Sequence, residues 1–201
     1  MPYVLGLTGN IACGKTTIGL MLLELGASVY VDADNIVHEL YLPGQALPPL
    51  IAQAFGPGAL DGDGGVDRRA LGAMVFGSPE RLRQLEEIVH PAVREELIRR
   101  MRALGPDDVG VLDAVKLIES GYAPFCHGIW IVTCPPDTQI QRMIQTRGLT
   151  EEEARARLAA QPPIDAKLSL ATAVIHNDGS LDDLRQQVTE AWDKFKASLS
   201  E

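Results

Sequence analysis

The sequence predicts an α/β fold in which a parallel β-sheet is flanked by helices. Short apolar stretches typical of buried strands alternate along the chain with longer helical stretches, as in parallel strands joined by right-handed crossovers. A glycine-rich loop also joins the first predicted strand to the first predicted helix, which places a binding site at the carboxyl ends of the strands. At 201 residues, the chain has the length of one such domain with smaller lobes inserted.

Five apolar stretches form the predicted sheet. They are residues 3–7, 28–31, 109–112, 128–133 and 173–175. Helices are predicted over residues 17–25, 137–147 and 181–198, and over a stretch that begins after Thr150 and stops at Pro162. Thr150 has the position of an N-cap, with Glu153 placed to complete a capping box.

A long and mostly helical block, residues 35–104, separates the second strand from the third. Its predicted helices are residues 36–42, 47–55, 68–76, 79–89 and 92–104, and a loop over residues 56–65 carries five glycines. Pro91 is placed in the first turn of the last helix, where a missing N–H is tolerated. The block predicts an inserted lobe, which leaves a core of residues 1–34, 105–137 and 166–201 and a lid of about residues 138–165.

The residues from Gly9 to Thr16 read GNIACGKT and fit the phosphate-binding pattern G-x-x-x-x-G-K-[ST] at every fixed position. Gly9 and Gly14 let the backbone turn so that successive N–H groups point at phosphate oxygens. Lys15 would place its ammonium on the β- and γ-phosphates, and Thr16 would offer its hydroxyl to Mg²⁺. Because a predicted strand precedes the motif and a helix follows it, the sequence predicts that the chain binds a nucleoside triphosphate.

Cys13 lies inside this loop. Its place near a helix N-terminus and Lys15 predicts a lowered pKa, and hence a thiol whose oxidation or alkylation blocks nucleotide binding. Cys126 and Cys134 lack metal-ligand spacing and are expected to pack as small apolar residues.

Composition excludes several classes of protein. The formal net charge of −9 argues against a nonspecific nucleic-acid binder, because no global positive field would attract the phosphates. No apolar stretch approaches the length of a membrane span. Because the first strand begins at residue 3, there is no room for a signal peptide, and we expect a cytoplasmic protein. We also expect a monomer or a small homo-oligomer.

Two aspartates follow the second predicted strand. Phosphoryl transfer to a hydroxyl needs a carboxylate that orients the hydroxyl and takes its proton, and Asp34 is the leading candidate because it lies just past the strand end. Asp32 could serve instead, or could simply cap the helix that follows.

Other charged residues follow the later strands. Asp113 ends the third strand, where a carboxylate could help hold Mg²⁺ through water or could simply form a turn. Arg142 and Arg147 lie in the helical stretch after the fourth strand, and Arg155 and Arg157 follow on the next helix. Such a cluster could neutralise charge on the γ-phosphate from a mobile lid, although each arginine alone fits a solvated helix face.

Several motifs together resemble the dephospho-CoA kinase family of P-loop small-molecule kinases. They are spread over nearly the whole chain and comprise GLTGNIACGKTT from residue 6, VDADNIVHELYLPG from residue 31, DGGVDRRAL from residue 63, LEEIVHP from residue 85, QRMIQTRGLTEEEARARLAAQ from residue 141 and AVIHNDGS from residue 173. The phosphate loop is generic, but the loop, DAD and HP in this order are much more specific.

The resemblance implies a P-loop NTPase-type fold with a helical CoA-binding lobe and a lid. It implies ATP-dependent phosphorylation of the ribose 3′-hydroxyl of dephospho-CoA, the last step of coenzyme A synthesis, with Mg²⁺ as cofactor. By position, Asp34 would be the base, Arg142 would act from the lid, and Asn177 would lie near the adenine. The remaining implied contacts fall into two sets. Those with ATP are Gly9, Ala12, Cys13, Gly14, Lys15, Thr16, Thr17 and Arg147; those with dephospho-CoA are Asp32, Arg69, His90 and Leu117.

The chain departs from the family pattern at two places. Lys116 stands where an apolar residue is usual, which puts the local acceptor contacts in doubt, and Cys13 replaces a small Gly or Ser. Two other functions stay open from the residues alone. One is a kinase for another hydroxyl or phosphate acceptor, and the other is a nucleotide-dependent switch that hydrolyses ATP without an acceptor.

Overall fold

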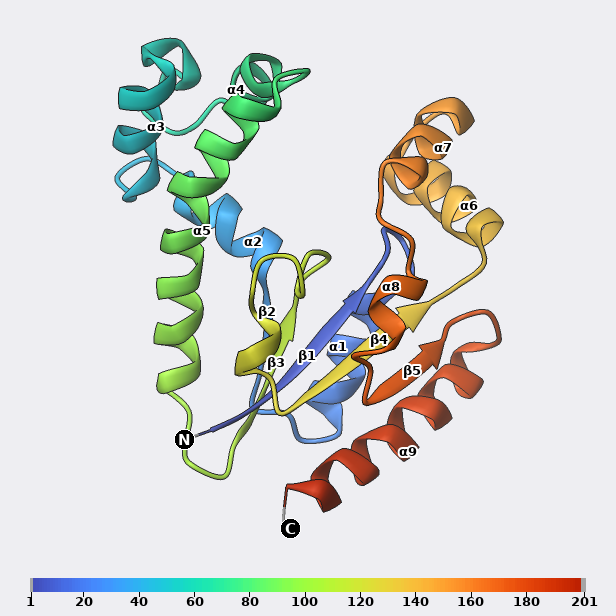
Figure 1. The fold of residues 1–201 in the computed structure, drawn as a ribbon. Helices are drawn as coiled ribbons and strands as arrows, with labels where there is room; N and C mark the ends of the chain where they lie inside the picture. Colours follow the sequence, from blue (N-terminus) through green and yellow to red (C-terminus); the bar gives the residue numbers. More distant parts are fainter. Residues whose placement is uncertain (1, 200–201) are drawn as a thin grey trace. The chain divides into compact units, whose positions relative to one another are not determined.

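The computed structural model describes residues 2–199 of the chain, which divide into two compact units. The first unit runs up to Val31 and resumes at Leu104, and the second comprises residues 32–103. Figure 1 labels the elements of both.

The first unit is built on a five-stranded sheet. Its strands are β1 (Tyr3–Gly9), β2 (Val29–Asp32), β3 (Val109–Asp113), β4 (Gly128–Thr133) and β5 (Ala173–His176), in the order β2-β3-β1-β4-β5. The pairs β1–β3, β1–β4 and β4–β5 are parallel, with Leu5 opposite both Val111 and Gly128. Central β1 is buried along almost its whole length, as expected of a parallel strand covered on both faces.

Helices α1 (Lys15–Glu24) and α9 (Leu181–Ser198) of the first unit pack on this sheet. The unit also contains α6 (Pro136–Arg147), α7 (Glu151–Ala159), the short α8 (Asp165–Leu168) and a 3₁₀ turn η2 (Ala123–Phe125). Ile18 and Leu22 of α1 share one buried core with Trp192 of α9 and with Leu5 and Trp130 of the sheet. Burying this apolar surface is the main force that holds the two helices against the strands.

The second unit is helical. It contains α2 (Ala33–Leu40), α3 (Leu47–Phe55), α4 (Arg68–Val75) and α5 (Pro79–Arg102), with a 3₁₀ turn η1 (Pro57–Ala59). The glycine-rich loop before α4 is closed by an isolated antiparallel bridge between Leu60 and Val66.

The predicted break before Pro91 is wrong, because α5 runs without interruption for 24 residues with Pro91 inside it. Its buried residues are Val89, Val93, Leu97 and Met101, which recur every four residues on both sides of the proline. An apolar stripe at this spacing lies on one face of a helix. Burial of the stripe therefore outweighs the one backbone hydrogen bond that the proline removes.

Candidate active site

The phosphate loop adopts a conformation that suits its glycines. Gly14 has a φ of 96°, and a Cβ there would lie 2.1 Å from Nδ2 of Asn177. Gly9 has a φ of 152°, and a Cβ there would lie 2.4 Å from the carbonyl oxygen of Val132. Ala12 has a φ of 58°, and within residues 2–199 it is the one non-glycine residue with a positive φ. Backbone strain of this kind gathers at functional loops.

Asn177, which follows β5, stabilises the phosphate loop through a hydrogen bond. Its buried side chain donates from Nδ2 to the carbonyl oxygen of Cys13 at 2.8 Å, and its backbone N–H donates to Thr133 at 2.8 Å. Arg142 of α6 donates to three neutral oxygens, namely the carbonyl of Ala12 and both the carbonyl and Oδ1 of Asn177, at 3.3 to 3.4 Å. Arg142 has no carboxylate partner in the described part of the chain, so its charge is free to meet an anion.

Lys15, the first residue of α1, lies beside the end of β3. Its Nζ is 3.9 Å from Oδ1 of Asp113, and both side chains are largely buried. Tyr30 of β2 donates its hydroxyl hydrogen to Oδ2 of Asp113 at 2.6 Å, a contact that the sequence analysis missed. The carboxylate of Asp113 and the hydroxyl of the exposed Thr16 both offer oxygen atoms as metal ligands, the ligand type that Mg²⁺ prefers.

The predicted reactivity of Cys13 is wrong. Its side chain is fully buried in the core beneath the loop. Burial raises the pKa of this thiol to about 11 and outweighs the ammonium of Lys15, which lowers it. A protonated and inaccessible thiol is a packing residue rather than a reactive one.

Helices α6 and α7 form a small pair beside the loop. Ile140, Met143 and Ala154 make a separate core that packs against Ile11 and Ala12 of the loop. The predicted capping box of Thr150 and Glu153 is confirmed. Beyond α7, Oε1 of Gln161 accepts the backbone N–H of Ile11 at 2.8 Å.

The other arginines of this segment differ from Arg142. Arg155 pairs with Glu151 at 2.8 Å on an exposed helix face, which fits the solvated alternative. Arg147 and Arg157 are also exposed. Within this pair of helices, the structure therefore ties Arg142 to the phosphate loop.

The two aspartates after β2 have different surroundings. Oδ1 of Asp32 accepts the backbone N–H groups of Asp34 and Asn35 at 2.8 and 3.3 Å, which makes Asp32 the N-cap of α2. The side chain of Asp34 is exposed and lines a cavity of about 360 Å³ within the helical unit. The helix begins at Ala33, earlier than predicted, so Asp34 lies in its first turn.

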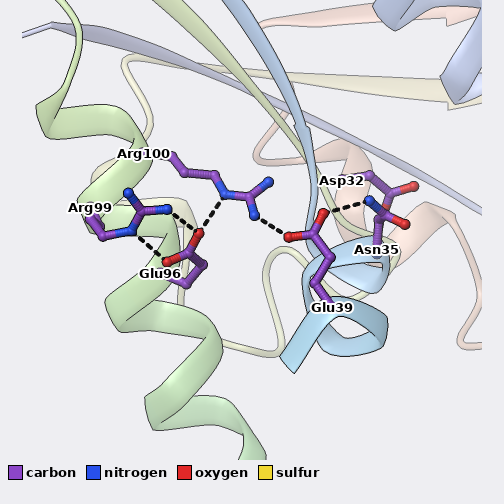
Figure 2. A network of polar contacts seen from close by, with 6 residues as sticks. All are labelled: Asp32, Asn35, Glu39, Glu96, Arg99 and Arg100. Carbon is purple, nitrogen blue, oxygen red and sulfur yellow. Dashed lines mark hydrogen bonds and ion pairs between the residues drawn. The ribbon is translucent and has the colours of Figure 1, made fainter. Parts of the chain in front are cut away.

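A polar network links α2 to α5, as Figure 2 shows. Glu39 of α2 accepts from Asn35 at 2.9 Å through one oxygen and pairs with Arg100 of α5 through the other. Glu96 accepts from Arg99 and Arg100 at 2.6 to 2.7 Å. The hydrogen bonds from Arg99 and then from Arg100 lower the pKa of Glu96 to about 2. This network fixes how α2, which carries Asp34, lies against α5.

Three residues expected to contact the acceptor are placed as follows. Arg69 is exposed on α4, and it is Arg68 that lines the cavity beside Asp34. His90 lines a different, open cavity of about 680 Å³ along α5 with Arg94 and Arg102. The side chain of Leu117 is fully buried against Gly6, which contradicts the expectation that it faces the acceptor.

Lys167 of α8 is a buried cation that the sequence analysis missed. It donates to the carbonyl oxygen of Val115 at 2.7 Å and pairs with Glu119 at 3.1 Å. It thereby fastens the loop that follows β3 and carries the exposed Lys116.

No helix in residues 2–199 combines the length and apolar character needed to cross a membrane.

The sequence model of the dephospho-CoA kinase family matches residues 3–183. A curated dephospho-CoA kinase from Symbiobacterium thermophilum is 48% identical over 192 residues, which cover 94% of this chain and 80% of that protein. One from Geobacillus kaustophilus is 41% identical over 202 residues, which cover 98% of this chain and 100% of that protein.

Solved structures agree with these sequence matches. The protein TT1252 from Thermus thermophilus has a TM-score of 0.83 at 35% identity, covering 96% of this chain and 97% of that one. Dephospho-CoA kinase from Campylobacter jejuni has a TM-score of 0.63 at 26% identity with the same coverage. Shikimate kinase from Acinetobacter baumannii, at 17% identity and a TM-score of 0.53 over 98% of this chain and 95% of that one, shares the fold alone. The predicted fold class and family resemblance are confirmed.

Proposed function

The chain belongs to the dephospho-CoA kinase family, and on that premise we propose that it transfers the γ-phosphoryl group of ATP to the ribose 3′-hydroxyl of dephospho-CoA, forming coenzyme A and ADP. The observation that carries this proposal is the family match over residues 3–183, because it spans the phosphate loop as well as the helical unit with Asp34. The helical unit is the proposed acceptor-binding lobe, and residues 138–165 are the proposed lid.

The first unit holds ATP in this proposal. The amides of the loop from Gly9 to Thr17, with Ala12, Cys13 and Gly14 between, bind phosphate oxygens at the N-terminus of α1. The ammonium of Lys15 and the guanidinium of Arg142 stabilise the charge that grows on the transferred group. Arg142 already lies against the loop and has only neutral partners, which supports this role. Arg147 on the lid is a further proposed contact.

Mg²⁺ is the proposed cofactor. Thr16 would bind it through its hydroxyl, and Asp113 would help hold it through water; both are oxygen ligands of the kind that this ion takes. When bound, the ion neutralises charge on the β- and γ-phosphate oxygens. Tyr30 keeps the carboxylate of Asp113 oriented through its hydrogen bond of 2.6 Å.

The helical unit supplies the base. Asp34 accepts the proton of the 3′-hydroxyl and orients the oxygen for in-line attack. Asp32 is less suited to this task, because one of its oxygens is already engaged by two backbone N–H groups. The exposed carboxylate of Asp34 lines a cavity, where an acceptor can reach it. We therefore assign the base to Asp34 and the helix cap to Asp32.

A coupled ADP-release assay with Mg-ATP, run with and without dephospho-CoA, tests the proposal. Mass spectrometry of the product should find 3′-phosphorylated CoA, with ADP release dependent on the acceptor. Equal ADP release without acceptor would point to an ATPase switch, and transfer to a nucleoside in place of dephospho-CoA would point to another small-molecule kinase.

The proposal also includes a cytoplasmic location, where ATP is available, which cell fractionation can check. It further includes a monomeric or small homo-oligomeric state, which light scattering can check.

A further inference from the structure

The cavity beside Asp34 lies among three helices of the helical unit. Its volume is about 360 Å³, and aliphatic side chains of α2, α4 and α5 form much of its wall. Its polar lining consists of the carboxylate of Asp34, the imidazole of His38, the phenol of Tyr41 and the guanidinium of Arg68. A candidate base and two nitrogen-bearing side chains thus share one small cavity.

Arg68 is placed to bind an anion. Its Nη1 lies 3.5 Å from Nδ1 of His38, and no carboxylate pairs with it in the described part of the chain. Arg100 in the same unit is held by Glu39 and Glu96 and is not available for a ligand. Burial raises the pKa of Tyr41, which lines the same cavity, and the charge of Arg68 partly opposes this effect. The positive charge of Arg68 therefore acts inside the cavity.

We infer that this cavity binds the diphosphate of the acceptor, with Arg68 as the main ligand and His38 as a second donor. The inference rests on the proposed function and specifies how its acceptor is recognised. In dephospho-CoA, the diphosphate is attached to the same ribose that carries the 3′-hydroxyl. A site that binds the hydroxyl at Asp34 must therefore accommodate two phosphate groups nearby, and a guanidinium matches phosphate oxygens in charge and geometry.

Gly72 provides space in the same cavity. It lies on α4 one turn after Arg68 and lines the cavity, and a Cβ at this position would meet no heavy atom within 4 Å. A larger side chain at this position can therefore take up room that the ligand needs. Because leucine has a higher helix propensity than glycine, Gly72→Leu is expected to keep the helix intact.

The first experiment compares Arg68→Gln with Arg83→Gln, a matched control that removes the same charge from an exposed arginine of α5 that does not line the cavity. Loss of one charge-assisted phosphate contact should raise the KM for dephospho-CoA about 10- to 100-fold in Arg68→Gln, with the KM for ATP unchanged. Arg83→Gln should stay within about twofold of the wild type. Adenosine, which lacks the diphosphate, should inhibit Arg68→Gln and the wild type with the same inhibition constant.

Gly72→Leu gives a second and independent readout. It should raise the KM for dephospho-CoA while the melting temperature stays at or above the wild-type value. The assignment is overturned if both arginine variants have the same KM for dephospho-CoA, or if Gly72→Leu binds dephospho-CoA as tightly as the wild type. A wild-type chain that forms no CoA at all overturns the proposed function instead, so the two failures are distinguishable.

Discussion

Replacing Asn177 with alanine distinguishes two roles for this residue. One is a contact with adenine, and the other is structural support of the phosphate loop through hydrogen bonds, called the brace below. The side chain is only 7% exposed and donates to the carbonyl oxygen of Cys13 at 2.8 Å. Its Oδ1 also accepts from Arg142 at 3.3 Å. These contacts favour the brace, because they occupy both ends of the amide with groups of the protein.

The cost of Asn177→Ala can be worked from these contacts. Removing the amide leaves the carbonyl of Cys13 without its side-chain donor, which costs about 1–3 kcal/mol when such a group is buried. The longer bond from Arg142 adds less, so we expect a loss of about 2 kcal/mol in the free energy of unfolding of the first unit. For a chain of this length, that loss lowers the melting temperature by about 4–8 °C.

The assay pairs thermal unfolding with kinetics. A looser loop should raise the KM for ATP about tenfold and the KM for GTP by the same factor, since the loop is proposed to bind the phosphates and not the base. Asn177→Asp is the matched control. It keeps the volume but turns an acceptor toward the Cys13 carbonyl, and should be at least as unstable as the alanine variant. An unchanged melting temperature with an altered preference between ATP and GTP would refute the brace and support the adenine contact.

Three other predictions follow from the site. Asp34→Asn should lower kcat by about 10²- to 10⁴-fold with the Kd for ATP unchanged, as measured by single-turnover kinetics and calorimetry; retention of near-normal turnover would remove Asp34 as the base. Iodoacetamide at neutral pH should leave Cys13 unmodified in the native protein by mass spectrometry, because burial raises its pKa to about 11, and rapid native-state labelling would contradict that placement. Glu96→Gln should destabilise the helical unit by on the order of 1–2 kcal/mol at pH 7 after solvent screening. Because the pKa of Glu96 is lowered to about 2, this contribution is full above the ordinary value of 4.5 and is lost as pH falls toward 2. Urea unfolding of both proteins at pH 7 and pH 3 should therefore show a smaller difference at pH 3, and a constant difference would argue against the ionised network.

Local signals explain which parts of the fold the sequence could predict. The bounds of α3, β4 and α9 agree with the prediction residue for residue, since each has an apolar pattern with clear turn or cap residues beside it. The break at Pro91 was predicted from the proline alone. The stripe from Val89 to Met101, visible in the same sequence, was the stronger signal. A local rule failed where burial along a whole helix opposed it.

The error on Cys13 has a similar origin. Its neighbours in the sequence, a helix N-terminus and Lys15, both favour a thiolate. The opposing effect is burial in a core to which β1, β4 and α9 contribute, and these elements are distant in the sequence. A pKa depends on the folded surroundings of a group, so residues adjacent in the sequence alone predicted the wrong direction for the pKa shift of Cys13.

The proposed acceptor residues are harder to predict from the sequence than the proposed nucleotide residues, for a physical reason. The phosphate loop is one continuous stretch, so a spacing motif identifies it completely. The cavity beside Asp34 is assembled from three helices, and its cation is Arg68 rather than the adjacent Arg69. Arg68, Leu71 and Gly72 are spaced by three and four residues, a helical pattern that places them on one face and could have singled out Arg68. Because this face is separate in sequence from the loop, we expect that substitutions on α4 change how the acceptor is recognised without altering a proposed ATP ligand.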